Sequence, residues 1–343
     1  MTGIVTTEGR IGVIGAGSWG TTLANLLVEK GLPVDLWVFE EDLFRVMEKE
    51  RENKIFLPGI RLLEGLRMTH SLEEAFAGKA IVVCAVPSHV VREIFTQGRP
   101  YLRDDALIIS ATKGLENKSL QTVSQVLREA IGRIPGAEIA CLSGPSFAKE
   151  VSRRLPTAVA VAGSTAEAGR KAQELFARPY FRVYTNPDLV GVELGGAIKN
   201  VMAIASGASD GLGFGHSSRA ALITRGLAEM ARLGIKMGAD AQTFFGLAGL
   251  GDLVLTCTGD LSRNRSLGLE LGKGRSLSSI LEGMRMVAEG IRTTKALIEL
   301  ARKLEVEMPI TEKVHEILYK GKNPREAVAE LMSRQPRSER EEP

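Results

Sequence analysis

Short runs of β-branched and other apolar residues alternate with helical patterns through the first half of the chain. We predict strands at residues 10–14, 34–39, 80–86, 106–111, 138–142, 158–162 and 181–184. Strands that are apolar along their whole length, with helices between them, are typical of a mostly parallel sheet that is covered on both faces. The pattern therefore predicts a doubly wound α/β domain.

After about residue 187 the strand-like runs nearly disappear and helical periodicity takes over. Helices are expected at residues 189–208, 218–233, 239–245, 277–281, 293–304, 312–318 and 324–331. We predict an α/β domain over residues 1–188, an all-helical domain over residues 189–332 and a flexible charged tail over residues 333–343. Either domain is long enough to bury its own core.

A Gly-x-Gly-x-x-Gly pattern follows the first predicted strand and opens the first predicted helix. Gly15 permits the tight turn, Gly17 lets the backbone approach a pyrophosphate, and Gly20 lets the helix pack on the sheet. Free N–H groups at the start of the helix would bind the phosphates of a dinucleotide. The alternative is a glycine-rich turn without a ligand, but the strand–helix context favours a Rossmann-type dinucleotide site.

The end of the second predicted strand bears on the choice between NAD and NADP. Glu40 lies twenty residues beyond Gly20, where an acidic side chain accepts hydrogen bonds from the ribose hydroxyls and repels a 2′-phosphate. This favours NAD. The alternative is that Glu40 begins a solvated helix with Glu41 and Asp42. Phe39 either lines the adenine pocket or caps the strand.

The composition excludes several classes of function. The 44 Lys and Arg nearly balance the 41 Asp and Glu, so we expect no nucleic-acid partner. The three Cys and four His have no metal-ligand spacing, so we expect no metal site. The longest apolar run, residues 80–86, is far shorter than the ~20 residues that span a bilayer. The N-terminal residues do not resemble a signal peptide. We therefore expect a cytoplasmic protein without membrane insertion.

Three loops at the ends of predicted strands carry polar residues. Lys113 follows a wholly apolar strand, and its ammonium can supply positive charge to an anionic substrate, unless it is only a surface lysine. The turn that contains Gly144 and Ser146 offers N–H groups and hydroxyls, or is only a turn. His89 fits the first turn of a helix capped by Ser88 better than it fits a catalytic position.

Lys199 is the most informative single residue. It is the only cation in the apolar helix predicted at residues 189–208, and no carboxylate on its own helical face can pair with it. Burial lowers the pKa of an ammonium toward that of a general base. The adjacent Gly195 and Gly196 would admit a substrate or cofactor. We therefore expect a lysine, in place of histidine, to move the proton; the alternative is a lysine at the edge of the helix.

A second polar group follows in the helical half. Asp252 could orient a lysine ammonium or a substrate hydroxyl. Arg263 offers a bidentate fork for a phosphate, and Ser262 and Asn264 supply further hydrogen bonds from what we interpret as a polar loop.

Seven ordered motifs resemble those of the soluble, bacterial-type NAD(P)-dependent glycerol-3-phosphate dehydrogenase family. They occupy residues 15–21, 111–114, 143–148, 194–200, 249–253, 262–265 and 287–290. The resemblance extends from residue 10 to about residue 330. It implies hydride transfer between NAD(P) and the pair sn-glycerol 3-phosphate and dihydroxyacetone phosphate, a supply of glycerol phosphate for phospholipid synthesis, and a homodimer.

The resemblance also implies roles for individual residues. Lys199 matches the proton acceptor, with Lys113, Asp252 and Thr256 beside it. The matched substrate-contacting positions are Lys113, Gly144, Ser146, Lys199, Asp252, Ser262, Arg263 and Asn264. The matched cofactor-contacting positions are Ser18, Trp19, Lys113, Ala148, Arg263, Val287 and Glu289. Family members often carry a basic residue where this chain has Phe39 and Glu40, a departure that favours NAD over NADP.

Two alternatives are weighed against this interpretation. A related two-domain dehydrogenase of a hydroxy acid or ketopantoate would also use a lysine of the helical domain, but Arg263 and its neighbours favour a phosphorylated substrate. A non-catalytic dinucleotide-binding regulator would need no base, so Lys199 and Asp252 argue against it.

Overall fold

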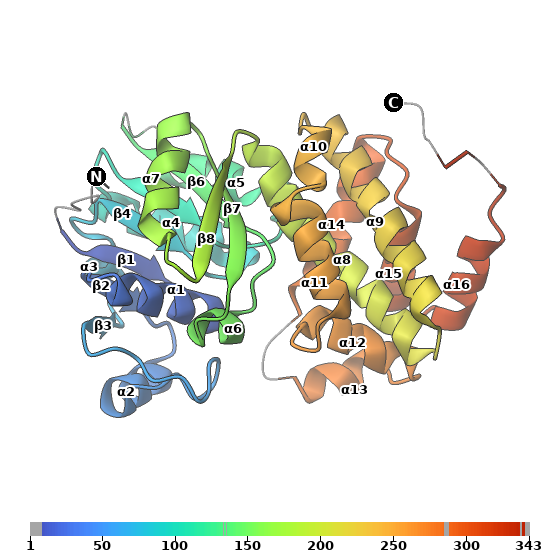
Figure 1. Cartoon of the computed structure of the whole chain (residues 1–343), viewed down its shortest axis with the longest axis horizontal. Helices are drawn as coiled ribbons and strands as arrows, with labels where there is room; N and C mark the ends of the chain where they lie inside the picture. The colour runs from blue at the N-terminus through green and yellow to red at the C-terminus, as the bar shows by residue number, and fades with distance from the viewer. Residues whose placement is uncertain (1–8, 133, 135, 285–287, 337, 340–343) are drawn as a thin grey trace.

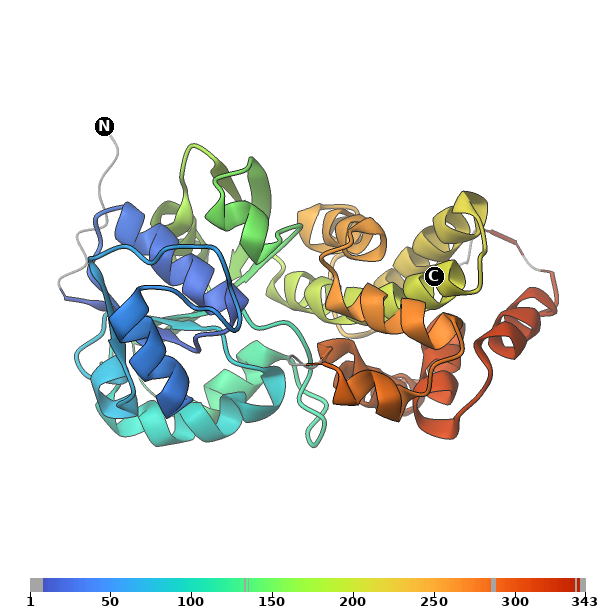
Figure 2. The same cartoon turned by 90° about the horizontal axis from the view of Figure 1, so that it is seen from below.

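The structure is a computed structural model that describes residues 9–132, 134, 136–284, 288–336 and 338–339. It has two parts that lie side by side, one built on a β-sheet and one built of helices (Figures 1 and 2). The sheet ends at Asn186 and the long helix α8 begins at Leu189, with Asp188 capping the helix by accepting a hydrogen bond from the Gly191 N–H at 2.8 Å.

The sheet has eight strands in the order β3-β2-β1-β4-β5-β6-β7-β8. The strands are β1 (Ile11–Ile14), β2 (Val34–Trp37), β3 (Leu66–Thr69), β4 (Ile81–Cys84), β5 (Leu107–Ser110), β6 (Glu138–Ser143), β7 (Thr157–Gly163) and β8 (Phe181–Asn186). Only the pairing of β6 with β7 is antiparallel among these described strands. The predicted doubly wound sheet is confirmed, although β3 was not expected.

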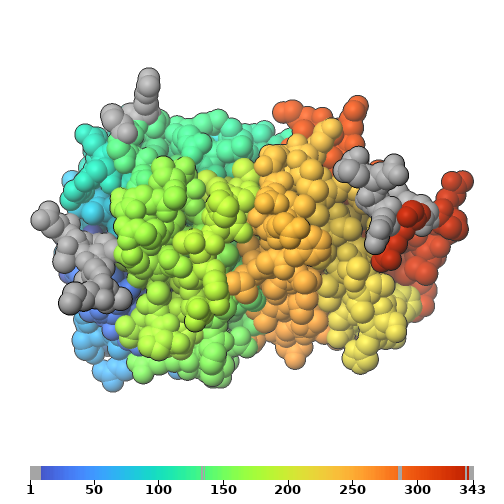
Figure 3. Space-filling view, turned by 45° about the horizontal axis from the view of Figure 1, so that its top comes forward, coloured from blue at the N-terminus to red at the C-terminus, as the bar shows by residue number. Residues whose placement is uncertain are grey.

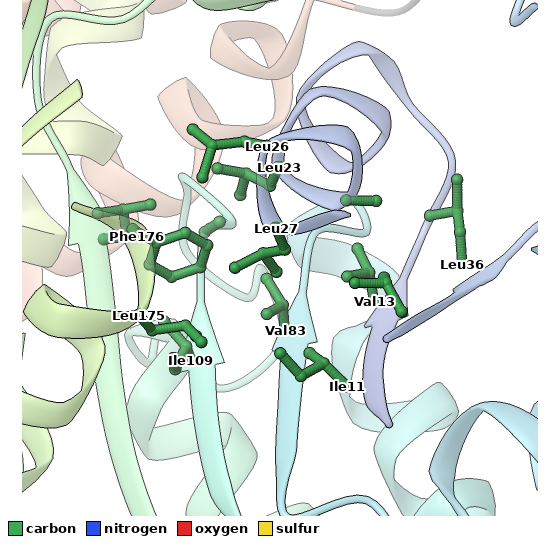
Figure 4. Close-up of a cluster of buried hydrophobic side chains, with 14 of the residues drawn as sticks. Ile11, Val13, Leu23, Leu26, Leu27, Leu36, Val83, Ile109, Leu175 and Phe176 are labelled. Atoms are coloured by element: carbon green, nitrogen blue, oxygen red, sulfur yellow. The ribbon is translucent and has the colours of Figure 1, made fainter. Parts of the chain in front are cut away.

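Helices cover both faces of the sheet. They are α1 (Ser18–Glu29), α2 (Glu41–Glu50), α3 (Leu72–Phe76), α4 (Val91–Gly98), α5 (Val123–Ile131), α6 (Ala148–Ser152) and α7 (Ala166–Phe176), with short 3₁₀ turns η1 (Ser88–Val90) and η2 (Arg99–Tyr101). Alternate strand residues point to opposite faces. Val83 and Ile109 therefore pack with α1 and α7 (Figure 4), whereas Val82 and Ile108 pack with α3, α4 and α5.

The helical part surrounds α8 (Leu189–Gly211). Its other helices are α9 (His216–Lys236), α10 (Ala241–Phe244), α11 (Asp252–Thr258), α12 (Arg263–Gly272), α13 (Leu277–Glu282), α14 (Glu289–Lys303), α15 (Pro309–Lys320) and α16 (Pro324–Met332), and a π-helical turn η3 (Leu247–Gly251) precedes α11. The predicted all-helical fold of this part is confirmed.

By length and composition, α8 could cross a membrane, as could the bent pair formed by residues 241–258 and 263–272. However, 89% of the apolar window of α8 is buried inside the protein, as expected for a core helix.

Glycines bring α12 into backbone contact with α8. A Cβ on Gly207 would overlap the carbonyl oxygen of Arg265, and a Cβ on Gly268 would overlap that of Ile204. This crossing fixes the start of α12 beside α8.

The two parts are in direct contact (Figure 3). Leu115, from the loop after β5, is buried in the hydrophobic core of the helical part. Glu193 of α8 accepts hydrogen bonds from the N–H and the hydroxyl of Ser124, in the first turn of α5, at 2.7 and 2.5 Å. These contacts hold the loop after β5 and the start of α5 against the helical part.

Candidate active site

Three charged side chains meet where the two parts join. Lys199 projects from α8, Asp252 is the first residue of α11, and Lys113 lies in the loop after β5. One carboxylate oxygen of Asp252 accepts a hydrogen bond from the Lys199 Nζ at 2.7 Å, and the other accepts one from the Lys113 Nζ at 2.6 Å. Asp252 thus bridges two ammonium groups that come from different parts of the fold.

A hydroxyl and a carbonyl complete this cluster. The Lys199 Nζ donates to the Thr256 Oγ1 at 2.7 Å, and Thr256, one helical turn after Asp252, donates to the carboxylate at 3.2 Å. The Lys113 Nζ also donates to the carbonyl of Gly144 at 3.2 Å. Lys199 lacks a partner on its own helix, as expected, but it is not an unpaired ammonium, because α11 supplies the carboxylate.

The environment moves the pKa of both central groups. Burial lowers the pKa of Lys199 to about 8, although the attraction of Asp252 acts in the opposite direction. Burial alone would raise the pKa of Asp252, but the charges of Lys113 and Lys199 together hold it below its usual range. Lys199 can therefore exchange a proton near neutral pH beside a carboxylate that stays ionised.

The glycines next to Lys199 do not open a path for a ligand, which corrects our expectation. A Cβ on Gly195 would overlap the carbonyl oxygen of Ala248. A Cβ on Gly196 would lie 2.6 Å from the Ser143 Oγ and 3.4 Å from the Cγ of Lys113. Their missing side chains admit other segments of the protein, which pack directly on α8.

The Gly-x-Gly-x-x-Gly turn has the geometry that a dinucleotide needs. Gly15 has φ +112°, and a Cβ on Gly20 would overlap the carbonyl oxygen of Gly15. A Cβ on Gly17 would meet no described atom within 4 Å, so this backbone is open to a ligand. The helix starts at Ser18 without a side-chain cap. The indole N–H of Trp19 is buried and has no hydrogen-bond partner among the described residues. The residues present therefore fit a bound NAD(P).

The end of β2 carries an exposed aromatic ring and an exposed carboxylate. Phe39 is 68% exposed and contacts the ring of Trp37 edge-on. Glu40 is the N-cap residue of α2, and Glu41 and Asp42 follow in its first turn. A solvated helix does begin at Glu40, as one expectation had it. Its carboxylate is nevertheless exposed at the edge of the sheet where the glycine turn lies, so a contact with the ribose hydroxyls is compatible with that helix.

Several other predicted cofactor positions lie at helix starts. Ala148 is the first residue of α6, and its carbonyl accepts a hydrogen bond from the Thr22 hydroxyl of α1 at 3.3 Å. Glu289 is the first residue of α14. Burial raises the pKa of Glu289 to about 7, against the nearby charges of Arg263 and other cations of the site. Val287 lies outside the described residues.

The predicted polar loop around Arg263 is the start of a helix, which corrects our interpretation. Ser262 caps α12 by accepting a hydrogen bond from the Arg265 N–H at 3.2 Å. Asn264 donates to the Asn200 side chain at 3.0 Å and accepts from the Gly290 N–H at 3.0 Å. Ser262 thus caps its own helix, whereas Asn264 links α12 to α8 and α14.

Arg263 differs from its neighbours. Its side chain is exposed, and it makes no hydrogen bond or ion pair with the part of the chain that the structure describes. It lies close enough to Glu289 for their charges to interact. It is therefore a cation available to an anionic ligand beside the cluster. In the turn after β6, Gly144 has φ +139°, and the Ser146 hydroxyl donates to its carbonyl at 3.2 Å.

Two residues of the site were not predicted as members of it. Asn200 is buried and hydrogen-bonded to Asn264, and a polar residue directly after Lys199 in an apolar helix was a signal for it. Ser143, at the end of β6, has a buried hydroxyl without a hydrogen-bond partner among the described residues.

His89 lies in the 3₁₀ turn η1. The residue that caps this turn is Pro87 and not Ser88, so the predicted cap was wrong.

No group of three or more His, Cys, Asp or Glu in the described residues could hold a metal ion. The three cysteines are buried and free.

Comparison with known proteins places this chain in a family. Its residues 10–169 match the model of the NAD-dependent glycerol-3-phosphate dehydrogenase N-terminus, and residues 188–329 match that of the C-terminus. A glycerol-3-phosphate dehydrogenase [NAD(P)+] of Geobacter sp. (strain M21) is 58% identical over 330 residues, covering 96% of this chain and 98% of the relative. One of Desulfotalea psychrophila is 53% identical over 327 residues, covering 94% and 96%.

Solved structures agree. A glycerol-3-phosphate dehydrogenase of Coxiella burnetii superimposes with a TM-score of 0.91 at 42% identity, covering 95% of this chain and 99% of that one. A ketopantoate reductase of Ralstonia eutropha shares the fold alone, at 15% identity and a TM-score of 0.59 over 93% of this chain and all of that one. The resemblance seen in the sequence is confirmed, and the chain belongs to the NAD-dependent glycerol-3-phosphate dehydrogenase family.

Proposed function

We propose that this chain interconverts sn-glycerol 3-phosphate and dihydroxyacetone phosphate with NAD or NADP, and that Lys199 is its general acid and base. The observation that carries the proposal is the buried Lys199–Asp252–Lys113 cluster at the junction of the two parts. In this proposal residues 1–188 hold the dinucleotide and residues 189–332 supply most of the substrate site.

Lys199 would move the proton of the C2 hydroxyl. In the oxidative direction its neutral amine takes that proton, and in the reductive direction its ammonium returns a proton to the carbonyl oxygen. The nicotinamide of bound NAD(P) supplies the hydride acceptor for oxidation and the hydride donor for reduction. A pKa of about 8 makes both forms of Lys199 accessible near neutral pH.

The other members of the cluster support this exchange. Asp252 stays ionised and orients both ammonium groups through its two oxygens. Lys113 would place its ammonium near the substrate oxygen on which negative charge develops. Thr256 holds the Lys199 Nζ from a second direction, so the amine has a fixed position before the substrate arrives.

The dinucleotide would lie along the carboxyl edge of the sheet. Gly15, Gly17 and Gly20 bring the backbone close to the pyrophosphate, and the uncapped start of α1 at Ser18 donates N–H groups to it. Trp19, Ala148, Val287 and Glu289 are proposed as further cofactor contacts. Glu40, exposed at the end of β2, favours NAD over NADP.

Arg263 is proposed to bind the phosphate of the substrate, with Gly144, Ser146, Ser262 and Asn264 shaping the surrounding pocket. Replacing Arg263 by alanine is expected to raise KM for dihydroxyacetone phosphate about 10- to 100-fold and to change kcat less, because a charged hydrogen bond to the phosphate is lost. Steady-state kinetics measures both constants. The matched control is Arg302→Ala, which replaces an exposed arginine in the last turn of α14. An unchanged KM in Arg263→Ala would mean that the phosphate binds elsewhere.

The cellular setting is proposed on the same basis. We infer a cytoplasmic homodimer that supplies glycerol phosphate for phospholipid synthesis and binds no nucleic acid. The support is membership of the family and the small substrate that the site fits. Size-exclusion chromatography with light scattering tests the dimer.

The function is tested by following NADH oxidation at 340 nm with dihydroxyacetone phosphate as the substrate. Turnover is expected with this phosphate ester and not with ketopantoate or a simple 2-oxo acid, because those lack the group that Arg263 would bind. Preference for ketopantoate would favour the related dehydrogenase, and absence of turnover with every substrate would favour a dinucleotide-binding regulator.

The same assay tests the choice of cofactor. NADPH in place of NADH is expected to give the lower kcat/KM, and equal values would refute the role given to Glu40.

A further inference from the structure

A π-helical turn leads directly into the catalytic cluster. The turn η3 ends at Gly251, and Asp252 is the next residue, at the start of α11. Such turns are rare and are frequently found at functional sites. The position of η3 therefore determines where the Asp252 carboxylate lies.

The turn rests on α8 by direct backbone contact at one glycine. A Cβ added to Gly195 would overlap the carbonyl oxygen of Ala248 in η3 and would lie 2.9 Å from its carbonyl carbon. Any larger residue at position 195 must push the turn outward, because a backbone carbonyl cannot rotate away as the end of a flexible side chain can. The spacing between η3 and α8 is thus set by the absence of a side chain at this one position.

The same turn of α8 carries the side chain of Lys199. Gly195 lies four residues before Lys199, so the two occupy the same face of the helix. Side chains on a helix lean toward its N-terminus, which brings the Lys199 stem over the turn that contains Gly195. The face of α8 that contacts η3 is therefore the same face that carries the Lys199 side chain.

The neighbouring glycine provides a contrast. A Cβ on Gly196 would lie 2.6 Å from the Oγ of Ser143 and 3.4 Å from the Cγ of Lys113. These are side-chain atoms, and the Ser143 hydroxyl has no hydrogen bond to the described residues that would prevent its rotation. A methyl group at position 196 can be accommodated, whereas one at position 195 cannot.

We propose that Gly195 is a positioning residue of the reaction, which holds Asp252 at hydrogen-bond distance from Lys199 by letting the Ala248 carbonyl of η3 rest on α8. Gly195 touches neither substrate nor cofactor, and it acts only through Asp252. The inference rests on the role proposed above for Lys199 as the base.

The consequence is a change in the proton affinity of Lys199. The charged or titratable groups that face Lys199 are Asp252 and Cys257 of α11, Lys113 of the loop after β5 and Glu289 of α14. Displacing η3 moves Asp252 away from Lys199 and weakens the attraction that favours the ammonium. An increase of somewhat less than 1 Å in their separation corresponds to a downward shift of roughly one pH unit.

The test is the pH dependence of kcat/KM for glycerol 3-phosphate oxidation by Gly195→Ala. Its acid limb is expected to move to lower pH by roughly half to one unit relative to the wild type. The matched control is Gly211→Ala in the same helix, where a Cβ would overlap the carbonyl oxygen of Leu269, far from the cluster. This control is expected to lower the melting temperature and to leave the acid limb in place.

Gly249→Ala provides a second test if Gly195→Ala does not fold. A Cβ there would overlap the carbonyl oxygen of Phe244, so this variant also displaces η3 and is expected to shift the acid limb. The inference would be overturned if the folded Gly195→Ala and Gly249→Ala variants kept the acid limb of the wild type and only lost stability, as Gly211→Ala does. Gly195 would then be a packing residue. Failure of the proposed function is distinguishable, because the wild type itself would then not oxidise glycerol 3-phosphate.

Discussion

Replacing Lys199 by alanine is expected to lower kcat for glycerol 3-phosphate oxidation about 10²–10⁴-fold, the usual contribution of a positioned general base. The side chain is buried, burial lowers its pKa to about 8, and its Nζ is held by Asp252 and Thr256. Without it, the C2 hydroxyl would lose the amine that is proposed to take its proton. The loss is measured at saturating substrate, with NADH binding followed by fluorescence.

Binding of the dinucleotide separates a catalytic role from misfolding. Lys199→Ala is expected to bind NADH with a Kd near that of the wild type, because the glycine turn around Gly17 lies in the other part of the fold. Lys236→Ala, at the exposed end of α9, is the matched control and should retain normal kcat. Near-normal turnover in Lys199→Ala would eliminate it as the base.

Replacing Asp252 by asparagine is expected to lower the free energy of unfolding by about 3–5 kcal/mol, the usual cost of breaking a buried ion pair. Asp252 is 1% exposed and is the shared counter-charge of Lys113 and Lys199. The uncharged amide cannot offset two ammonium groups, and its N–H₂ would face one of them as a second donor. Oxidation of glycerol 3-phosphate should fall as well, because Lys199 loses its orientation. Urea unfolding at pH 7 measures the stability.

The pH dependence of that stability loss has a definite sign. The pKa of Asp252 is held below its usual range, so its stabilising charge is present at neutral pH and is lost as pH falls through that lowered pKa. The difference between Asp252→Asn and the wild type should therefore shrink in strong acid. Asp260→Asn removes an exposed partner of Arg265 and should cost at most about 1 kcal/mol. A similarly small cost for Asp252→Asn at pH 7 would contradict the bridging role.

The fold was largely predictable because most of its strands are short apolar runs that alternate with helical patterns. The unexpected elements are those with weak apolar patterns. In β3, at the edge of the sheet, Arg67 faces solvent and interrupts the apolar run. In α7, alanines, a glycine and charged residues supply most of the sequence, and alanine burial gives a faint periodicity. Edge position and small side chains leave little signal in the residue pattern.

The arrangement of the site was less predictable than its members. Lys199 could be recognised from its own apolar helix, but its hydrogen-bond partner Asp252 is 53 residues away, and Lys113 is 139 residues from that carboxylate. Local sequence carries no information about such pairings. The same reason explains the error at Gly195, where the missing side chain admits the backbone of η3 and not a ligand.

The pH dependence of kcat/KM for glycerol 3-phosphate oxidation by the wild type tests the central claim most directly. In the proposed mechanism the base is the neutral amine of Lys199, whose pKa is lowered to about 8 by burial. The rate constant should therefore fall tenfold per pH unit below about pH 8 and level off above it, while reduction of dihydroxyacetone phosphate should decline above that pH because it uses the ammonium. A profile that is flat from pH 6 to 9, or one that is unchanged in Lys199→Ala, would contradict the assignment of Lys199 as the group that moves the proton.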